Sequence, residues 1–412
     1  MNASNRVVGF DEALKTVLLR ASDLQTSATE TLPLLECGGR ILAEPLRTDR
    51  DQPPFDRSTR DGFAVRAAEV KQPLRVIGQI RAGERWQGGP MESGCAIEIM
   101  TGAPVPEGAD AVVMVEHVAQ TDGSVRLAEG RMLRAGENIV PRGSEARAGQ
   151  IVLAAGAAIG AAEIALAASC GCSQLTVYRR PRLAIVATGD ELVELDETPD
   201  DQQIRNSNSY GLAALVASAG GEAVRMPIAR DRSDALEKII VEARRCSDLL
   251  LLSGGVSMGK YDLVEQVLRS MGAEFFFTGV KMQPGKPVVF GRLPTSGELP
   301  AQFFFGLPGN PISTQVTFHC FVAPMLRAMS GAATVSPPFA QATLAEDVPG
   351  KPELTRVLPA HLNYNHAHPE VRIVAWQGSG DLAANARANC YAVLPPERHQ
   401  FAAGDVITIL LR

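Results

Sequence analysis

The feature that most constrains this chain is an alternation of apolar runs and helical segments between residues 182 and 329. Runs such as Arg182–Thr188, Asp248–Gly254 and Gln302–Leu307 are apolar along almost their whole length. Strands with no polar face are typical of a parallel sheet that is buried on both sides. We therefore predict a three-layer αβα domain. Its helices are expected over Ser209–Ala219, Ser233–Cys246, Asp262–Ser270 and Pro311–Met329.

The flanking regions have a different texture. From residue 47 to 150, and again after residue 336, short apolar runs are separated by glycine, proline and Asp-Gly turns. This pattern predicts β-rich domains, of which the C-terminal one is a small barrel or sandwich. Between them, Ile151–Gly171 is rich in alanine but carries Glu163 at its centre, which disfavours a membrane span. We expect a strand followed by a helix there.

Charge and composition exclude some partners. The chain has 412 residues, a net charge of −6 and only 5% aromatic residues. Broad nucleic-acid binders are normally basic, and single-strand binders stack bases on aromatic side chains. The seven cysteines are odd in number and scattered, as expected in a reducing compartment. We therefore expect a cytoplasmic protein that binds neither nucleic acid nor a membrane.

Three of the predicted strands end in unusual turns. These turns are Gly189-Asp190-Glu191, Gly254-Gly255-Val256-Ser257 and Pro308-Gly309-Asn310-Pro311. Ligands of open α/β sheets bind beyond the carboxyl ends of the strands, so the three turns are expected to share one edge. Glycine lets backbone N–H groups approach an anion closely, and Asn310 and Pro311 suit the cap and first position of a helix. Ordinary strand-to-helix turns are the alternative interpretation.

The acidic residues near these turns suggest a metal ion. Four of them lie at or after predicted strand ends: Asp190, Glu191, Asp231 and Asp262. Carboxylate oxygens suit Mg²⁺, which commonly bridges them to substrate phosphates. Lys286, between turn residues, could meet a phosphate or simply be solvated. Residues 254–260 resemble a P-loop, but Tyr261 stands where a P-loop needs serine or threonine. The residues thus predict a Mg²⁺-dependent site for an anionic small molecule.

Six segments of the chain resemble the molybdopterin molybdotransferase family, called MoeA in bacteria and represented in animals by the gephyrin E domain. They occur in the family's order and together span essentially the whole chain. The segments are FDRSTRDGFAVR (residues 55–66), IMTGAPVPEGADAVV (99–113), IVATGDEL (185–192), LLSGGVSMGKYD (251–262), QPGKPVVFG (283–291) and GLPGNPIST (306–314).

The resemblance implies four domains and a homodimer. Domain I would comprise residues 1–46 and 147–177, with the β-rich domain II (47–146) inserted between them. Residues 178–330 would form the molybdopterin-binding αβα domain III, and residues 331–412 a C-terminal β-barrel, domain IV. In this family the active cleft is lined by domains III and IV of one protomer and domain II of the other.

The implied reaction inserts molybdate into adenylylated molybdopterin and releases AMP, with Mg²⁺ assisting. Carried over by motif, the implied catalytic residues are Asp61, Thr101, Asp190, Glu191, Asp262 and Lys286. The implied metal ligands are Asp190, Glu191, Asp231 and Asp262. The implied binding residues are Thr188, Gly189, Ser253, Gly254, Gly255, Ser257, Pro308, Gly309, Asn310, Pro311, Arg356 and Ser379.

Three positions depart from the family's pattern. Glu145 stands where many members carry aspartate, Gln283 where some carry lysine, and Lys260 where an acidic residue is common. Two other functions stay open: the ATP-dependent adenylylation of molybdopterin, and a mainly scaffolding dimer. The resemblance also implies other proteins of molybdenum cofactor biosynthesis as partners. The sequence does not distinguish molybdate from tungstate, because the two oxyanions are nearly isosteric.

Overall fold

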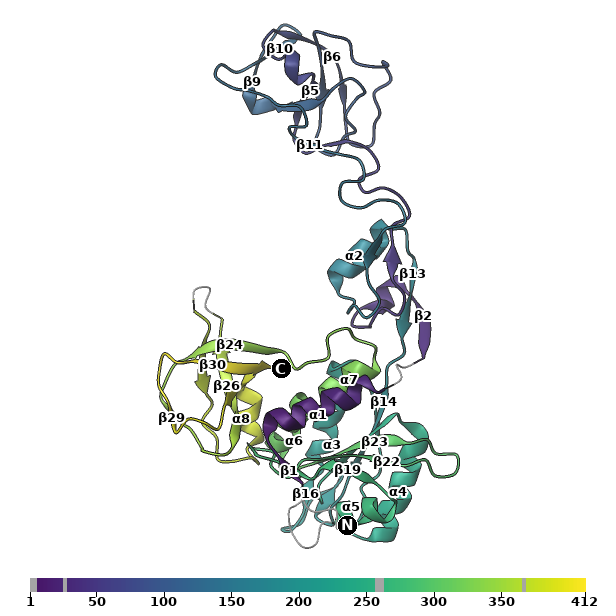
Figure 1. Ribbon diagram of the computed structural model, residues 1–412, viewed down its shortest axis with the longest axis vertical. Helices are drawn as coiled ribbons and strands as arrows, with labels where there is room; N and C mark the ends of the chain where they lie inside the picture. Colours follow the sequence, from purple (N-terminus) through teal and green to yellow (C-terminus); the bar gives the residue numbers. More distant parts are fainter. Residues whose placement is uncertain (1–5, 25–27, 256–262, 365–367) are drawn as a thin grey trace.

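The computed structural model describes residues 6–24, 28–255, 263–364 and 368–412. The chain is elongated (Figure 1). A helix-flanked sheet and a β-barrel lie side by side at one end, and a separate β-rich unit lies at the far end. A small unit between them contains α2 (Ala161–Ser169), β2 (Thr29–Pro33) and β13 (Gln174–Tyr178). Among the described residues, no helix is both long and apolar enough to cross a membrane.

The central sheet has the predicted parallel core. Its strand order is β17-β14-β18-β23-β22-β19. β17, β14, β18 and β23 are mutually parallel, and β22 and β19 are antiparallel to their neighbours. The strands are β14 (Arg182–Ala187), β17 (Glu222–Arg225), β18 (Leu249–Ser253), β19 (Glu274–Phe277), β22 (Val289–Leu293) and β23 (Gln302–Leu307).

Helices cover both faces of this sheet, which confirms the αβα prediction. Along β14, Leu183 and Ile185 join one apolar core while Ala184 and Val186 join the other. Successive strand residues point to opposite faces, so both must be apolar when both faces are covered. The first core contains α1 (Phe10–Ser22), α3 (Ser207–Ser218), α6 (Pro311–Thr317) and α7 (Ala323–Met329), and the second contains α4 (Ser233–Cys246) and α5 (Leu263–Ser270).

The segment before residue 47 is divided in space. Residues 6–22 belong to the sheet layer, because β1 (Val7–Val8) pairs with β20 (Gly279–Val280) and α1 packs beside α7. Residues after 28 instead pair with chain far downstream: β2 with β13, and β3 (Leu46–Arg47) with β12 (Ile151–Leu153). The small middle unit is therefore built from two pieces of chain.

The far β-rich unit and the C-terminal barrel account for the other apolar runs. The far unit is a six-stranded sheet in the order β8-β5-β7-β6-β10-β9. Its strands are β5 (Gly62–Val65), β6 (Leu74–Ile80), β7 (Cys95–Ile99), β8 (Ala111–Met114), β9 (Val118–Thr121) and β10 (Ser124–Leu127). The barrel closes through β26-β27-β24-β30-β28 and back to β26. Its strands are β24 (Phe339–Leu344), β26 (Thr355–Asn363), β27 (Glu370–Ile373), β28 (Cys390–Leu394) and β30 (Val406–Leu411).

The last helix of the sheet layer differs from the single helix expected over Pro311–Met329. A π-turn over Phe318–Val322 separates α6 from α7. Pro324, just after it, has no N–H to donate to the preceding turn, so the regular hydrogen-bond ladder cannot continue unchanged. The π-turn carries His319, whose ring lies 5.8 Å from that of Tyr391 in the barrel strand β28.

His319 should make this contact sensitive to acid. Burial, followed by the charges of Arg412 and Arg327, lowers the pKa of His319 from its ordinary value of 6.5 to about 4. Between these values the unfolded chain binds a proton that the folded chain does not, so stability falls as the pH falls. The loss should reach about 2 kcal/mol near pH 4.5. We predict that, between about pH 7.5 and pH 4.5, the melting temperature of His319→Gln falls less than that of the unsubstituted protein. Equal losses in both proteins would refute this assignment.

Candidate functional site

The three turns predicted from the sequence meet at one edge of the sheet. β14, β18 and β23 are parallel neighbours in register, with Ala187 opposite Ser253 and Ser253 opposite Leu307. Their carboxyl ends therefore open at the same place. A cavity of about 280 Å³ lies there. Its lining includes seven of the predicted residues: Thr188, Glu191, Ser253, Gly254, Gly309, Asn310 and Pro311.

Gly254 fits a position that other residues could not occupy without strain. Its φ is +93°, and a Cβ built on it would lie 2.5 Å from the carbonyl oxygen of Thr188. Thr188 N in turn donates to the carbonyl oxygen of Ser253 at 3.0 Å, and Gly254 N donates to that of Leu307 at 3.3 Å. The first two turns are thus packed backbone against backbone. This close approach explains why glycine follows the strand here.

The acidic residues at this edge are exposed and tied to one another. Asp231 accepts a hydrogen bond from the hydroxyl of Thr188 at 2.9 Å, and its own N–H donates to Oδ1 of Asp190 at 3.2 Å. Glu191 borders the cavity. In the described part of the chain, no three His, Cys, Asp or Glu side chains are grouped as metal ligands. Asp262 and Ser257, also predicted at the site, lie outside the described residues.

The third turn joins the sheet to the C-terminal region. Pro311 is the first residue of α6, as its fixed φ favours. Asn310 occupies the cap position, but its side chain makes no capping bond, contrary to our expectation. The hydroxyl of Thr314 donates to the carbonyl oxygens of Pro308 and Asn310, so it satisfies acceptors of the turn. The N–H of Ile312 donates to the carbonyl oxygen of Ser379 at 2.9 Å, which fixes Ser379 beside the turn.

The polar start of α3 also borders the cavity, although none of its residues was predicted to belong to the site. Asn208 Nδ2 donates to the carbonyl oxygen of Gly309 at 2.7 Å and to the hydroxyl of Ser253 at 3.3 Å, bridging two of the turns. Asn206 is 1% exposed, caps α3 through Ser209 N, and lines the cavity with Asn208. The run Asn206-Ser207-Asn208 is itself a helix-start signal. We instead expected the helix to begin at residue 209.

Asp61 and Thr101 form a pair in the far β-rich unit. Asp61 Oδ1 accepts hydrogen bonds from Thr101 N at 2.6 Å and from its hydroxyl at 2.8 Å. These bonds, the backbone one first, lower the pKa of Asp61 below its ordinary value, so the carboxylate stays ionised at neutral pH. Within one chain the unit that carries this pair lies far from the sheet (Figure 1). A single chain therefore does not bring Asp61 to Glu191.

The remaining predicted residues lie around the barrel junction. Lys286 is exposed, and its carbonyl oxygen accepts from Val280 N at 2.9 Å. Arg356 lies on β26 opposite Gln283 of β21 (Met282–Gln283), and burial lowers the pKa of its guanidinium. Glu145, the first departure from the family pattern, lies in the far β-rich part of the chain and pairs with Arg57 at 3.1 Å in an exposed position. Lys260, the third departure, lies outside the described residues.

Three family models match consecutive parts of the chain. The MoeA N-terminal region (domains I and II) matches residues 8–171, and a probable molybdopterin-binding domain matches residues 184–328. The MoeA C-terminal region (domain IV) matches residues 341–411. The middle model contains all three turns that border the cavity.

Whole-chain relatives agree with these models. A molybdopterin molybdenumtransferase of Nostoc sp. is 38% identical over 403 residues, covering 93% of this chain and 88% of the relative. One of Haemophilus influenzae is 33% identical over 391 residues, with 92% and 93% covered. The molybdopterin biosynthesis MoeA protein of Pyrococcus horikoshii superimposes with a TM-score of 0.79 at 28% identity, covering 99% of this chain and 100% of that one. Likeness at this level over nearly the full length places the chain in the MoeA family of molybdopterin molybdenumtransferases.

Proposed function

We propose that this protein is a molybdopterin molybdenumtransferase, which inserts molybdate into adenylylated molybdopterin and releases AMP. The observation that carries the proposal is the cavity at the carboxyl ends of β14, β18 and β23. Its polar lining comes from the segments that match the probable molybdopterin-binding domain. Relatives over nearly the full chain bear this enzyme name. The adenylylation of molybdopterin with ATP is the alternative function, and the names of the whole-chain relatives favour the transferase over it.

The residues present suit an anionic substrate. Gly254 and Gly309 line the cavity with backbone and no side chain, so a phosphate can approach the peptide N–H groups of these turns. The amides of Asn206 and Asn208 add neutral donors that carry no like charge toward the substrate. Lys286 and Arg356 are proposed to offset the remaining negative charge from the barrel side. Pro308 to Pro311, beside Ser379, is proposed as the place where molybdate binds.

Mg²⁺ fits the donor set at the same edge. Asp190, Glu191 and Asp231 are exposed carboxylates, and such oxygens are the ligands that Mg²⁺ prefers together with water and phosphate. We propose that these three hold the ion with Asp262. Bound there, Mg²⁺ would neutralise the pyrophosphate and polarise it toward hydrolysis. The Thr188 hydroxyl donates to Asp231 and the Asp231 N–H donates to Asp190, so these bonds link the two aspartates.

The proposed assembly is a homodimer with four domains per chain. Because Asp61 and Thr101 lie far from the cavity of their own chain, we propose that they complete the cavity of a partner subunit. The seven cysteines are all free, in agreement with the proposed cytoplasmic location. Adenylylated molybdopterin and molybdate are the proposed substrates.

The function is tested by AMP release from adenylylated molybdopterin in the presence of molybdate. We expect Glu191→Gln to lower turnover by about 100-fold or more, because a neutral amide cannot hold a divalent ion as a carboxylate does. Asp196→Asn, which removes an exposed carboxylate from the same segment outside the cavity lining, should keep normal turnover. No AMP release by the unsubstituted protein would overturn the proposed function.

A glycine substitution tests the packing of the turns. Gly254→Ala places a Cβ 2.5 Å from the Thr188 carbonyl oxygen at a φ of +93°, so the two turns must move apart. We predict a loss of AMP release of at least about tenfold, since displacement of about 1 Å can cost that much or more. Gly297→Ala is the matched control, because Gly297 also has positive φ, +58°, but nothing within 4 Å of its Cβ position. Equal activity of the two variants would contradict the prediction.

Complementation tests the shared cleft. Asp61→Ala and Glu191→Gln should each be inactive as pure dimers. If each cleft combines one chain's sheet with the other chain's far unit, a mixed dimer contains one cleft with both changes and one with neither. Random co-assembly should then restore about a quarter of normal activity. If both residues serve the same chain's site, co-expression restores nothing.

A further inference from the structure

A polar cluster holds the outer side of the loop that forms one wall of the cavity. We call residues 189–206 the site loop. Its two short strands, β15 (Leu192–Val193) and β16 (Ile204–Arg205), pair in parallel. Ile204 N donates to the Glu191 carbonyl oxygen at 2.8 Å, and Asn206 N donates to that of Val193 at 2.9 Å. Residues of both strands and their neighbours line the cavity, among them Glu191, Leu192, Ile204 and Asn206.

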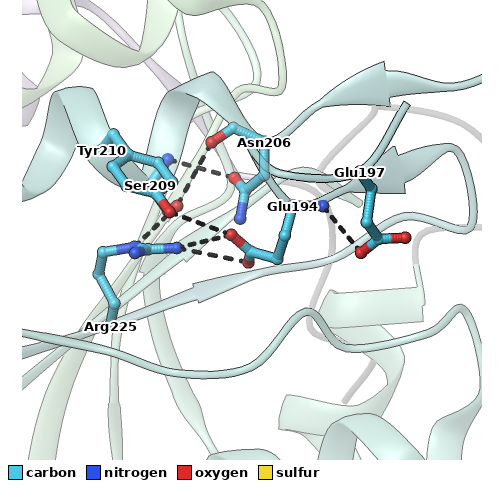
Figure 2. Close-up of polar contacts among 6 residues, drawn as sticks. All are labelled: Glu194, Glu197, Asn206, Ser209, Tyr210 and Arg225. Atoms are coloured by element: carbon cyan, nitrogen blue, oxygen red, sulfur yellow. Dashed lines mark hydrogen bonds and ion pairs between the residues drawn. The ribbon is translucent and has the colours of Figure 1, made fainter. Parts of the chain in front are cut away.

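Arg225 binds this loop from the neighbouring edge strand. Its Nη2 donates to both carboxylate oxygens of Glu194, at 3.0 and 3.3 Å, and its Nε donates to the Ser209 hydroxyl at 3.2 Å (Figure 2). The guanidinium also lies 3.6 Å from the centre of the Tyr210 ring. The hydroxyl of Tyr210 in turn donates to Glu194 at 3.2 Å. We call Glu194, Tyr210 and Arg225 the clamp.

The clamp joins the site loop to two elements of the sheet layer. Glu194 belongs to the site loop, Tyr210 to the first turns of α3, and Arg225 to the end of β17. The side chains of Arg225 and Glu194 are only 30% and 32% exposed, so water screens the ion pair less than it screens a fully exposed one. Arg230 fastens the other end of the loop, donating to the carbonyl oxygens of Asp190 and Leu192.

The clamp acts on the same wall that the substrate must contact. Asn206 ends the site loop and begins α3, and its Nδ2 has no hydrogen-bond partner among the described residues although the side chain is 1% exposed. Asn206 is also one of the residues that line the cavity. Glu191 lies three residues before Glu194 on the same loop. Displacing Glu194 would therefore move two residues of the cavity wall, Glu191 and Asn206.

We propose that Glu194, Tyr210 and Arg225 are positioning residues that hold the site loop in its ligand-binding arrangement. The proposal rests on the function proposed above for this cavity. A loop released from the clamp spends part of its time in arrangements that do not bind, and apparent affinity falls by that fraction. Bound substrate selects the competent arrangement again, so the rate of the bound complex is preserved. The clamp should therefore govern KM rather than kcat.

Hydrogen exchange in the ligand-free protein tests the clamp without reference to activity. In Glu194→Gln, amide exchange across residues 189–206 should become about threefold to tenfold faster, because the Ile204 and Asn206 N–H groups lose protection. Glu346→Gln is the matched control, since it removes the same group from an exposed ion pair with Arg372 in the barrel. Unchanged exchange in residues 189–206 of Glu194→Gln would overturn the clamp.

Kinetics then test the positioning role. KM for adenylylated molybdopterin should rise about threefold to tenfold in Glu194→Gln, with kcat within about twofold of normal. Tyr210→Phe keeps the ring under Arg225 and loses only one hydrogen bond, so its KM should be intermediate. Arg225→Lys keeps the charge but not the forked geometry or the ring stacking, and should resemble Glu194→Gln.

The outcomes separate the two proposals. A merely structural ion pair would lower melting temperature and the active fraction, and hence kcat, while KM stayed unchanged; that result would overturn the positioning role. Faster loop exchange with unchanged KM and kcat would overturn it too. If the unsubstituted protein released no AMP, the proposed function would fail, while the exchange measurement would still decide whether the clamp holds the loop.

Discussion

The parallel pairing of β14, β18 and β23 is the constraint on which the candidate site depends. Parallel strands in register place their carboxyl ends at one edge, so three turns far apart in the sequence become neighbours. Each turn alone contributes only a glycine, a carboxylate or a helix start. Together they border a single cavity. Helices on both faces hold this sheet by burying apolar side chains on each side.

The cavity also depends on contacts that are backbone to backbone. Gly254 lies against the Thr188 carbonyl, and its N–H donates to the Leu307 carbonyl oxygen. Such contacts leave little room for adjustment, because interiors are packed as closely as molecular crystals. The wall formed by residues 189–206 is different, since the side chains of Arg225, Tyr210 and Arg230 bind it to the rest of the domain. This difference explains why the proposed clamp concerns that wall and not the glycine turns.

Much of the site could be predicted because its signals are local. Five of its residues lie at or shortly after the ends of apolar strands: Thr188, Glu191, Ser253, Gly254 and Asn310. The apolar pattern of the strands therefore indicates where the turns lie. The capping role given to Asn310 was wrong: its side chain makes no capping bond, and the Ile312 N–H in the first turn of α6 donates to the Ser379 carbonyl oxygen. The expected continuous helix at Pro311 was also wrong, since Pro324 forces the hydrogen-bond ladder to shift. The roles of the site residues and the domain boundaries stay predictions.

The sequence alone determined the class of fold, the position of the turns and, by its ordered motifs, the family. These properties depend on local periodicity, on turn chemistry and on the order of segments along the chain. Only the tertiary structure decided that α1 joins the sheet layer, that Asn208 connects two turns, and that Arg225 meets Glu194 and Tyr210. It also separated Asp61 from Glu191 within one chain. Such relations depend on how distant segments pack, and side-chain spacing along the sequence carries no record of that.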